Sequence, residues 1–168
     1  CDYRLISLKK EELDGVVKEL LVSCDGFNVT IPYKTAVLPY LDEIDEAASA
    51  IGAVNTVKRV GNRLYGYNTD FYGMSKLIKK IGIDIKDKKV LILGTGGTSK
   101  TAKAVCEALL AKSVIKVSRK KSEDSITYTE AYENHADADI IINTTPVGMF
   151  PKNEDCPVDI DRFPFLSG

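Results

Sequence analysis

The sequence has no tryptophan, a single histidine and no excess of either charge. Its 168 residues hold no apolar run long enough to span a bilayer, so we expect no membrane-spanning role. The 24 acidic residues nearly balance the 23 Lys and Arg residues. This balance gives no bulk attraction to nucleic acid or to an anionic membrane. Internal repeats and low-complexity tracts are absent as well, which leaves an ordinary globular composition.

The four cysteines, Cys1, Cys24, Cys106 and Cys156, form no CxxC pair and have no second histidine nearby. We therefore expect no zinc site or other metal, and reduced thiols in the cytoplasm are the simpler interpretation. Cys24 and Cys106 have apolar neighbours and are predicted to be small core groups. His135 is predicted to be a surface residue near a helix end, with no catalytic role.

The two ends of the chain do not resemble natural termini. It starts at Cys1 rather than at methionine, and it stops at Gly168 just after an apolar stretch. No secretory signal is visible, although an internal start would hide one. We therefore expect a fragment that lacks both ends of a longer protein.

Hydrophobic periodicity predicts a small α/β domain in the first half of the chain. Glycine and proline set the limits of its elements, and Gly61-Asn62 is typical of a hairpin turn. We predict strands at residues 3–7, 27–31, 53–60 and 63–67, helices at 9–22 and 70–81, and helical pieces over 35–51 interrupted at Pro39.

The second half alternates strands and helices. Residues 90–93, 114–117 and 140–142 are continuous apolar runs, typical of strands buried on both faces of a parallel sheet. Helices are predicted at about 98–111 and 128–134. This order predicts a doubly wound, Rossmann-like α/β domain. We place the boundary in the charged stretch after Gly82, which gives domains of residues 1–83 and 84–168.

A glycine-rich turn, GTGG, follows the first buried strand of the second half. Gly94 allows the tight turn, Gly96 lets the backbone approach a pyrophosphate, and Gly97 lets the next helix start close to the sheet. That helix N-terminus offers unpaired N–H groups to phosphates. The spacing departs from GxGxxG, so a ligand-free connection is the alternative. The flanking strand and helix favour a dinucleotide.

Basic residues follow the next predicted strand. Enzymes that use NAD place an acid here for the ribose 2′-hydroxyl, whereas this chain has Ser118, Arg119 and Lys120. Arginine can bind a 2′-phosphate through two donors, and a neighbouring lysine adds positive charge. The segment therefore favours NADP. The alternative is a solvated basic turn.

Small polar residues occupy separate loops of the first half. Asn28 and Thr30 alternate with apolar residues on a predicted strand, so their side chains face the same way. Lys34, Asn55 and Asp70 lie on three further segments. Each has a structural alternative, such as a turn residue for Asn55 or a helix N-cap for Asp70. Together they suit a ligand with several hydroxyl groups.

Five motifs, in order along nearly the whole chain, resemble those of the shikimate dehydrogenase family. They are GFNVTIPYK at 26–34, GAVNT at 52–56, GYNTD at 66–70 followed by Gly73, GTGG at 94–97 and NTTPVGM at 143–149. The second position of the glycine turn is more often alanine in the family. An Asn-Arg-Thr triplet of the family is Ser118-Arg119-Lys120 here.

The resemblance implies a cytoplasmic, NADP-dependent enzyme of chorismate biosynthesis that reversibly reduces 3-dehydroshikimate to shikimate. Lys34 and Asp70 would form the catalytic pair. The substrate would also contact Asn28, Thr30 and Asn55. The cofactor would contact Gly94, Thr95, Gly96, Gly97, Thr98, Ser118, Arg119, Lys120, Thr144 and Met149.

Three other functions stay open at this point. A quinate/shikimate dehydrogenase of broader specificity is one, although the basic residues after residue 117 count against NAD. A folate-linked methylene dehydrogenase suits residues 28–34 less well. A non-catalytic nucleotide-binding relative has no need of both Lys34 and Asp70. The family's amino-terminal Ser-x-Ser segment and its carboxy-terminal tyrosine and glutamine are not found, so we expect this chain to lack part of the pocket.

Overall fold

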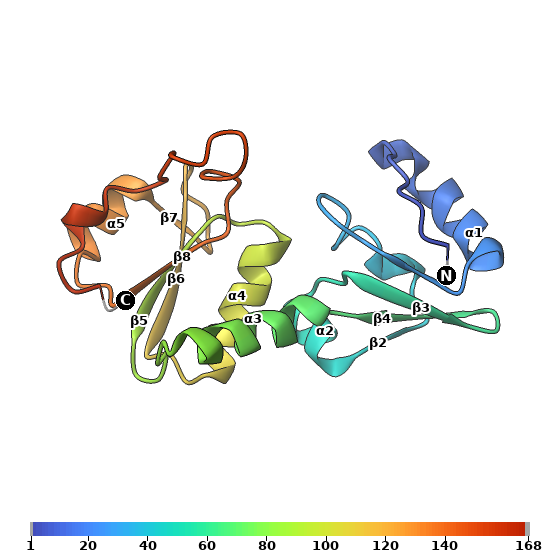
Figure 1. Cartoon of the computed structure of the whole chain (residues 1–168), viewed down its shortest axis with the longest axis horizontal. Helices are drawn as coiled ribbons and strands as arrows, with labels where there is room; N and C mark the ends of the chain where they lie inside the picture. The colour runs from blue at the N-terminus through green and yellow to red at the C-terminus, as the bar shows by residue number, and fades with distance from the viewer. Residues whose placement is uncertain (1, 167–168) are drawn as a thin grey trace. The chain divides into compact units, whose positions relative to one another are not determined.

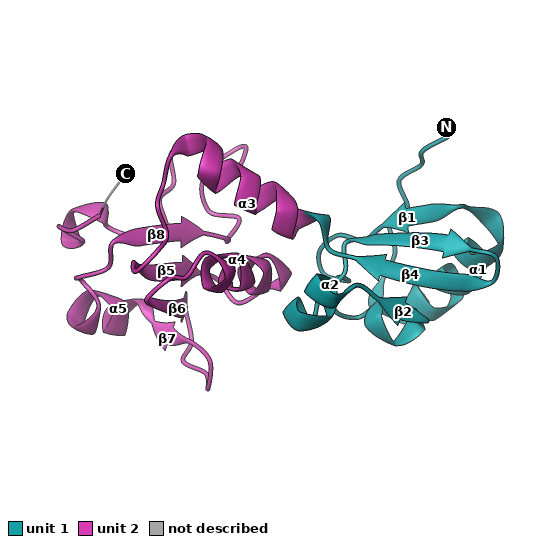
Figure 2. Ribbon diagram, turned by 90° about the horizontal axis from the view of Figure 1, so that it is seen from below, with its two compact units in different colours: residues 1–69 teal, residues 70–168 magenta. Residues whose placement is uncertain are grey.

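The chain divides into two compact units, Cys1–Thr69 and Asp70–Gly168 (Figure 1). The structure is a computed structural model and describes residues 2–166, so Cys1 lies outside the described residues. Each unit is built on its own four-stranded sheet, and Figure 2 shows the strands of each sheet side by side. The fold is α/β, as predicted.

The first unit has a mixed sheet in the order β1-β3-β4-β2. Strands β3 (Thr56–Val60) and β4 (Arg63–Tyr67) form the predicted antiparallel hairpin around Gly61. Strand β1 (Gly26–Asn28) pairs antiparallel with β3, and the two-residue β2 (Glu43–Ile44) pairs parallel with β4.

Two helices contribute to the core of this unit, α1 (Leu13–Ser23) and α2 (Glu46–Ile51). Short 3-10 turns, η1 (Lys10–Glu12) and η2 (Leu38–Tyr40), accompany them. Val57 and Leu64 point from the hairpin into this core, because alternate residues of a strand face opposite sides. The other face of β3 carries Thr56, Lys58 and the exposed Val60. The core residues are Leu13, Val17, Val29, Val37, Ala48, Val54, Val57 and Leu64.

Three sequence predictions for this unit were wrong in part. Residues 3–7 form no strand, since the chain there pairs with no strand among residues 2–166. The predicted strand 27–31 ends at Asn28, because the chain turns where the N–H of Tyr33 donates to the Thr30 carbonyl at 2.8 Å. Within 35–51 only α2 and η2 are helical. Pro39 fits inside η2, and β2 was not predicted.

The second unit has a fully parallel sheet in the order β7-β6-β5-β8. Its strands are β5 (Lys89–Leu93), β6 (Ser113–Ser118), β7 (Ile126–Thr127) and β8 (Ile140–Asn143). Helices α4 (Gly97–Ala108) and α5 (Tyr128–Asn134) alternate with them. The predicted doubly wound, Rossmann-like arrangement is confirmed, with β7 as an additional edge strand.

Helices cover both faces of the parallel sheet. Val90 and Ile92 pack with α4 and with α3 (Thr69–Ile81) on one face, and Leu91 and Leu93 pack with α5 and residues 158–166 on the other. Ile78 of α3 is 7% exposed and belongs to the core of the second unit. The two compact units divide between Thr69 and Asp70, and the domain boundary near residue 83 stays a prediction.

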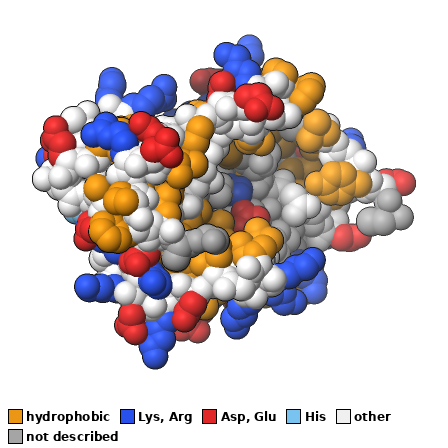
Figure 3. Space-filling model, turned by 60° about the vertical axis from the view of Figure 1, so that its left-hand side comes forward, with side chains coloured by type: hydrophobic (Ala, Val, Ile, Leu, Met, Phe, Trp, Pro, Cys, Tyr) orange, Lys and Arg blue, Asp and Glu red, His pale blue; other side chains and the backbone are white. Residues whose placement is uncertain are grey.

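The charged side chains, the cysteines and the helices each bear on one of the sequence predictions. Basic and acidic side chains are interspersed over the face seen in Figure 3. Cys24, Cys106 and Cys156 are free thiols, and burial raises the pKa of Cys106 to about 11, as suits a core residue. None of the helices in residues 2–166 combines the length and the apolar character that crossing a bilayer requires.

Helix α5 begins with a capping box. The Thr127 hydroxyl accepts from the Glu130 N–H at 3.2 Å, and the Glu130 carboxylate accepts from the Thr127 N–H at 2.8 Å. Lys121 also donates to this carboxylate. The Lys121 ammonium, followed by the Thr127 donors, lowers the pKa of Glu130 to about 2.

We expect Glu130→Gln to destabilise the fold at about pH 7 and to matter less in acid. A lowered carboxyl pKa contributes stability that is present above the unfolded value of 4.5 and is lost as pH falls toward about 2. Urea unfolding of both proteins at about pH 7 and about pH 3 measures the difference. Glu133→Gln, on the exposed side of α5, is the control. An unfolding difference that does not shrink in acid would contradict this assignment.

Candidate functional site

The polar residues of the first unit gather at one end of its sheet. Asn28 lies opposite Thr56, and Thr56 lies opposite Tyr67, so the three residues form a row across β1, β3 and β4. Asn55 immediately precedes β3, and Thr69 follows β4 after one residue. Strand register therefore brings together residues that are far apart in the sequence.

Asn55 is the centre of this group. Its Oδ1 accepts from the Thr69 N–H at 2.9 Å, from the Thr69 hydroxyl at 3.2 Å and from the Thr56 hydroxyl at 3.0 Å. The residue is 8% exposed. Because three donors already surround the oxygen, Nδ2 rather than Oδ1 is the part of the amide suited to a further hydrogen bond.

Asn28 is tied to the same network. Its Nδ2 donates to the Thr56 hydroxyl at 3.2 Å and to the Asn55 carbonyl at 3.4 Å, and Tyr3 donates to its Oδ1 at 3.3 Å. The structure thus brings the predicted Asn28 and Asn55 together. It also adds Thr56 and Thr69, which the sequence prediction missed although both lie within the quoted motifs.

The predicted Lys34 follows the turn after β1. Its carbonyl accepts from the Val54 N–H at 2.8 Å, so the lysine backbone is attached to the loop that ends in Asn55. The Lys34 side chain is half-buried. Thr30 is exposed and its carbonyl closes the turn to Tyr33. Within residues 2–166, the hydrogen bonds of the Asn55 network do not include the Thr30 side chain.

The hairpin end also contains residues whose role is structural. A Cβ on Gly66 would lie 2.5 Å from Leu41 Cδ1 and 2.9 Å from Val54 Cγ2, so any larger residue would force these two side chains to shift. Asn68 is 2% exposed and donates to the Ala53 carbonyl at 2.9 Å. Two residues of the GYNTD motif therefore shape the loop. The half-buried Asp70 lies in the first turn of α3, directly after Thr69.

The glycine turn of the second unit lies at the carboxyl edge of the parallel sheet. Gly94 has φ +111°, a value that residues with a side chain rarely adopt, and a Cβ there would lie 2.8 Å from the Thr144 hydroxyl. The Gly94 N–H donates to Val117 at 2.8 Å, and Thr144 donates its hydroxyl to the Leu93 carbonyl at 2.6 Å. The predicted Gly94 and Thr144 are therefore neighbours.

Helix α4 starts at this turn. Gly96 is its N-cap and makes no side-chain cap, and a Cβ at Gly96 would meet no atom within 4 Å. Thr95 and Gly96 are exposed, while Gly97 and Thr98 are half-buried. An exposed helix N-terminus without a capping side chain attracts an anion through its N–H groups and its dipole. The fold of this turn suits a pyrophosphate.

The basic segment begins at the end of β6, the strand next to the glycine turn. Ser118 is half-buried, and Arg119 and Lys120 are exposed. Burial raises the pKa of Tyr128, and the guanidinium of Arg119 opposes this shift, so Arg119 lies near the start of α5. Two cations thus lie on the loop after β6, where an NAD-binding chain carries an acid.

The loop after β8 is shaped by Asn143. Its Oδ1 accepts from the Thr145 N–H at 2.9 Å and hydroxyl at 2.7 Å, and its Nδ2 donates to the Val147 carbonyl at 2.9 Å. The sequence prediction missed this role, although Asn before Thr is a common turn pattern. Met149 is 65% exposed, and its contact with a cofactor stays a prediction.

Comparison with known proteins shows which proteins this chain resembles. The family described as the shikimate dehydrogenase substrate binding domain matches residues 1–57. A shikimate dehydrogenase (NADP(+)) of Clostridium beijerinckii is 42% identical over 95% of this chain. This chain is therefore similar to shikimate dehydrogenases along nearly its whole length. It spans 62% of the length of that relative.

Solved structures of shikimate dehydrogenases agree with this family. The chorismate mutase/shikimate 5-dehydrogenase fusion protein of Clostridium acetobutylicum superposes with TM-score 0.83 and 36% identity, over 94% of this chain and 60% of that one. The Thermus thermophilus shikimate 5-dehydrogenase in complex with NADP(H) and shikimate superposes with TM-score 0.78 and 30% identity, over 94% and 61%. Shikimate dehydrogenases therefore share the fold described above.

Proposed function

We propose that this chain is part of a cytoplasmic, NADP-dependent shikimate dehydrogenase that reversibly reduces 3-dehydroshikimate to shikimate in chorismate biosynthesis. The main support for this proposal is the position of two features of the second unit. The uncapped glycine turn at Gly96 and the exposed Arg119 lie at the carboxyl ends of adjacent parallel strands. That edge is where a doubly wound sheet binds a dinucleotide.

The NADP site would use the second unit. Gly96, Gly97 and the N–H groups that begin α4 would hold the pyrophosphate, since a Cβ at Gly96 would face open space. Arg119 and Lys120 would hold the 2′-phosphate. Thr144 supports Gly94, and Met149 would lie at the nicotinamide end. The bound cofactor supplies the hydride, so the protein has to supply position and a proton.

The substrate would lie on the first unit. The polar side chains of Asn28, Thr30 and Asn55 suit the hydroxyl and carboxylate groups of a small cyclic acid. Lys34 would stabilise the negative charge that develops on the ketone oxygen during reduction and would deliver the proton to that oxygen. Asp70 would orient Lys34 and complete the catalytic pair.

The basic loop also bears on the nearest alternative. A quinate/shikimate dehydrogenase that works with NAD needs an acceptor for the 2′-hydroxyl of ribose. Arg119 and Lys120 have donors only, and they would lose a favourable partner with NAD. The basic loop therefore supports NADP as the cofactor, and the proposed partner is a small molecule rather than a nucleic acid or a membrane.

Two glycine variants distinguish a residue needed for NADP binding from a residue needed for the stability of the fold. We expect Gly96→Ala to keep the melting temperature but to weaken NADP binding by about tenfold or more, because the new methyl group would occupy the space of the pyrophosphate. Gly94→Ala should instead lower stability by about 1–3 kcal/mol through its positive φ and its contact with Thr144. Calorimetry of NADP binding and thermal melting measure both. Normal NADP binding by Gly96→Ala would contradict the assignment of the turn.

The activity is tested by mixing shikimate and NADP with the full-length protein that contains this chain. We expect absorbance at about 340 nm to rise as reduced nicotinamide forms. Quinate and NAD, tested singly in place of shikimate and NADP, should give slower reactions. No rise with shikimate and NADP, or a faster reaction with quinate and NAD, would overturn the proposal.

A further inference from the structure

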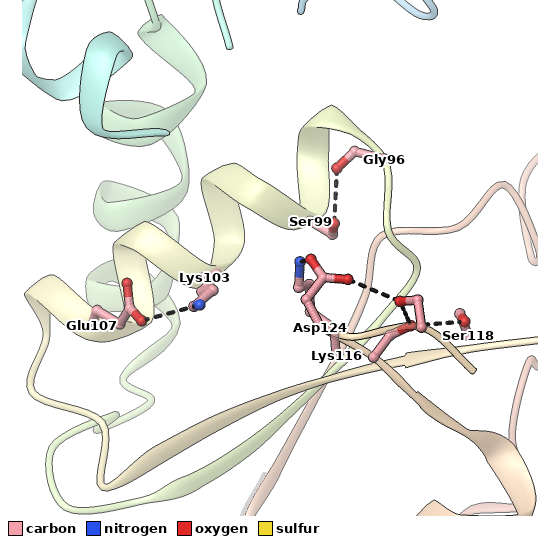
Figure 4. A network of polar contacts seen from close by, with 9 residues as sticks. Gly96, Ser99, Lys103, Glu107, Lys116, Ser118 and Asp124 are labelled. Carbon is pink, nitrogen blue, oxygen red and sulfur yellow. Dashed lines mark hydrogen bonds and ion pairs between the residues drawn. The ribbon is translucent and has the colours of Figure 1, made fainter. Parts of the chain in front are cut away.

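A chain of polar contacts connects a buried lysine to the basic loop after β6 (Figure 4). Lys116 is 8% exposed, and its ammonium pairs with the carboxylate of Asp124. The other oxygen of Asp124 accepts from the Ser122 hydroxyl at 3.0 Å. The pair therefore ties the far side of the loop to the middle of the strand.

A cluster of three serine hydroxyls continues the connection. Ser125 is 5% exposed, and its Oγ lies 2.6 Å from Ser122 Oγ and 3.2 Å from Ser118 Oγ. Ser118 in turn donates to the carbonyl of Lys120. Backbone bonds between Ser122 and Ser125, at 3.1 and 3.4 Å, close the turn. Residues 118–125 are thus held as a closed loop.

The basic side chains of this loop differ in their contacts. Lys121 is bound to Glu130 at the start of α5, whereas Arg119 and Lys120 are exposed. The contacts of the serine cluster reach the backbone of Lys120 directly. Lys116, followed by Ser122, holds the pKa of Asp124 below its usual range, so its carboxylate stays charged at neutral pH.

We infer that Ser125, together with the Lys116–Asp124 pair, positions Arg119 and Lys120 and thereby sets the preference for NADP over NAD. The inference rests on the proposed NADP site. A loop that is already ordered before binding loses less conformational entropy when the ligand binds. The affinity therefore rises for the ligand that the loop contacts. NAD lacks the 2′-phosphate and would gain little. Ser125, Lys116 and Asp124 are positioning residues without contact to the phosphate.

Two charge-neutral changes test the inference. Ser125→Ala removes the central hydroxyl, and the double variant Lys116→Met with Asp124→Ala removes the ion pair without changing net charge. Both should weaken NADP binding by about tenfold and change NAD binding by less than about twofold, because only the loop is released. Titration calorimetry with NADP and with NAD, at one ionic strength, measures the ratio of the two affinities.

The matched control lies on α4 of the same unit. Lys103 and Glu107 form an exposed ion pair at 3.7 Å, and the double variant Lys103→Met with Glu107→Ala should leave both affinities unchanged. Equal losses for NADP and NAD in the test variants would show a role in folding only, and unchanged affinities would show no role. Either result overturns the inference. A wild-type protein without preference for NADP would instead overturn the proposed cofactor.

Discussion

Lys34→Ala is expected to lower the turnover number for reduction of 3-dehydroshikimate by roughly 10²–10⁴-fold. The loss follows from the role of Lys34 in protonating the ketone oxygen, a step that matters in the transition state and little in substrate binding. Shikimate binding should therefore weaken far less than turnover falls. Steady-state kinetics give turnover, and calorimetry with shikimate gives the affinity.

The structure supports a local effect of this change. The Lys34 backbone carbonyl accepts from Val54, a bond that does not involve the side chain and should survive its removal. Lys10→Ala, in the exposed turn η1, is the control and should retain turnover. Near-normal turnover in Lys34→Ala would show that another group moves the proton. An affinity loss as large as the turnover loss would make Lys34 a binding residue only.

Arg119→Asp should weaken NADP binding by about 100-fold or more. It removes two charge-assisted donors and places a carboxylate beside the 2′-phosphate. The same carboxylate can accept from the ribose 2′-hydroxyl of NAD, so NAD binding should hold or improve. Steady-state kinetics with each cofactor give the ratio of the two specificity constants.

Lys86→Asp is the control for Arg119→Asp, because it makes the same change of charge. Lys86 is exposed on the segment before β5, at the amino end of that strand, and should leave the NADP to NAD ratio nearly unchanged. If Arg119→Asp lowered the use of both cofactors equally, the residue would support the loop but would not select the 2′-phosphate.

Local hydrophobic patterns in the sequence predicted most of the fold. The β3–β4 hairpin and strands β5, β6 and β8 were predicted because alternation and buried apolar runs depend on few neighbours. The two-residue strands β2 and β7 exist only through their partners β4 and β6, and no local pattern predicts such pairing. Residues 3–7 alternate as a strand does, yet no strand among residues 2–166 pairs with them.

The site was predicted by residue type rather than by contact. Motif order predicted Asn28, Asn55 and Thr144, and the structure gives each of them partners. The bonds from Thr69 to Asn55 were not predicted, because strand register decides which hydroxyl meets which amide. The serine cluster around Ser125 was missed for a similar reason, since its members meet only when the loop closes.

Transfer of deuterium from the nicotinamide ring tests the central claim most directly. NADPH labelled with deuterium at its transferable position is mixed with 3-dehydroshikimate and the protein, and the product is examined by mass spectrometry and NMR. We expect shikimate that carries one deuterium on the carbon of the new hydroxyl group. Shikimate without label, or no shikimate at all, would contradict the account.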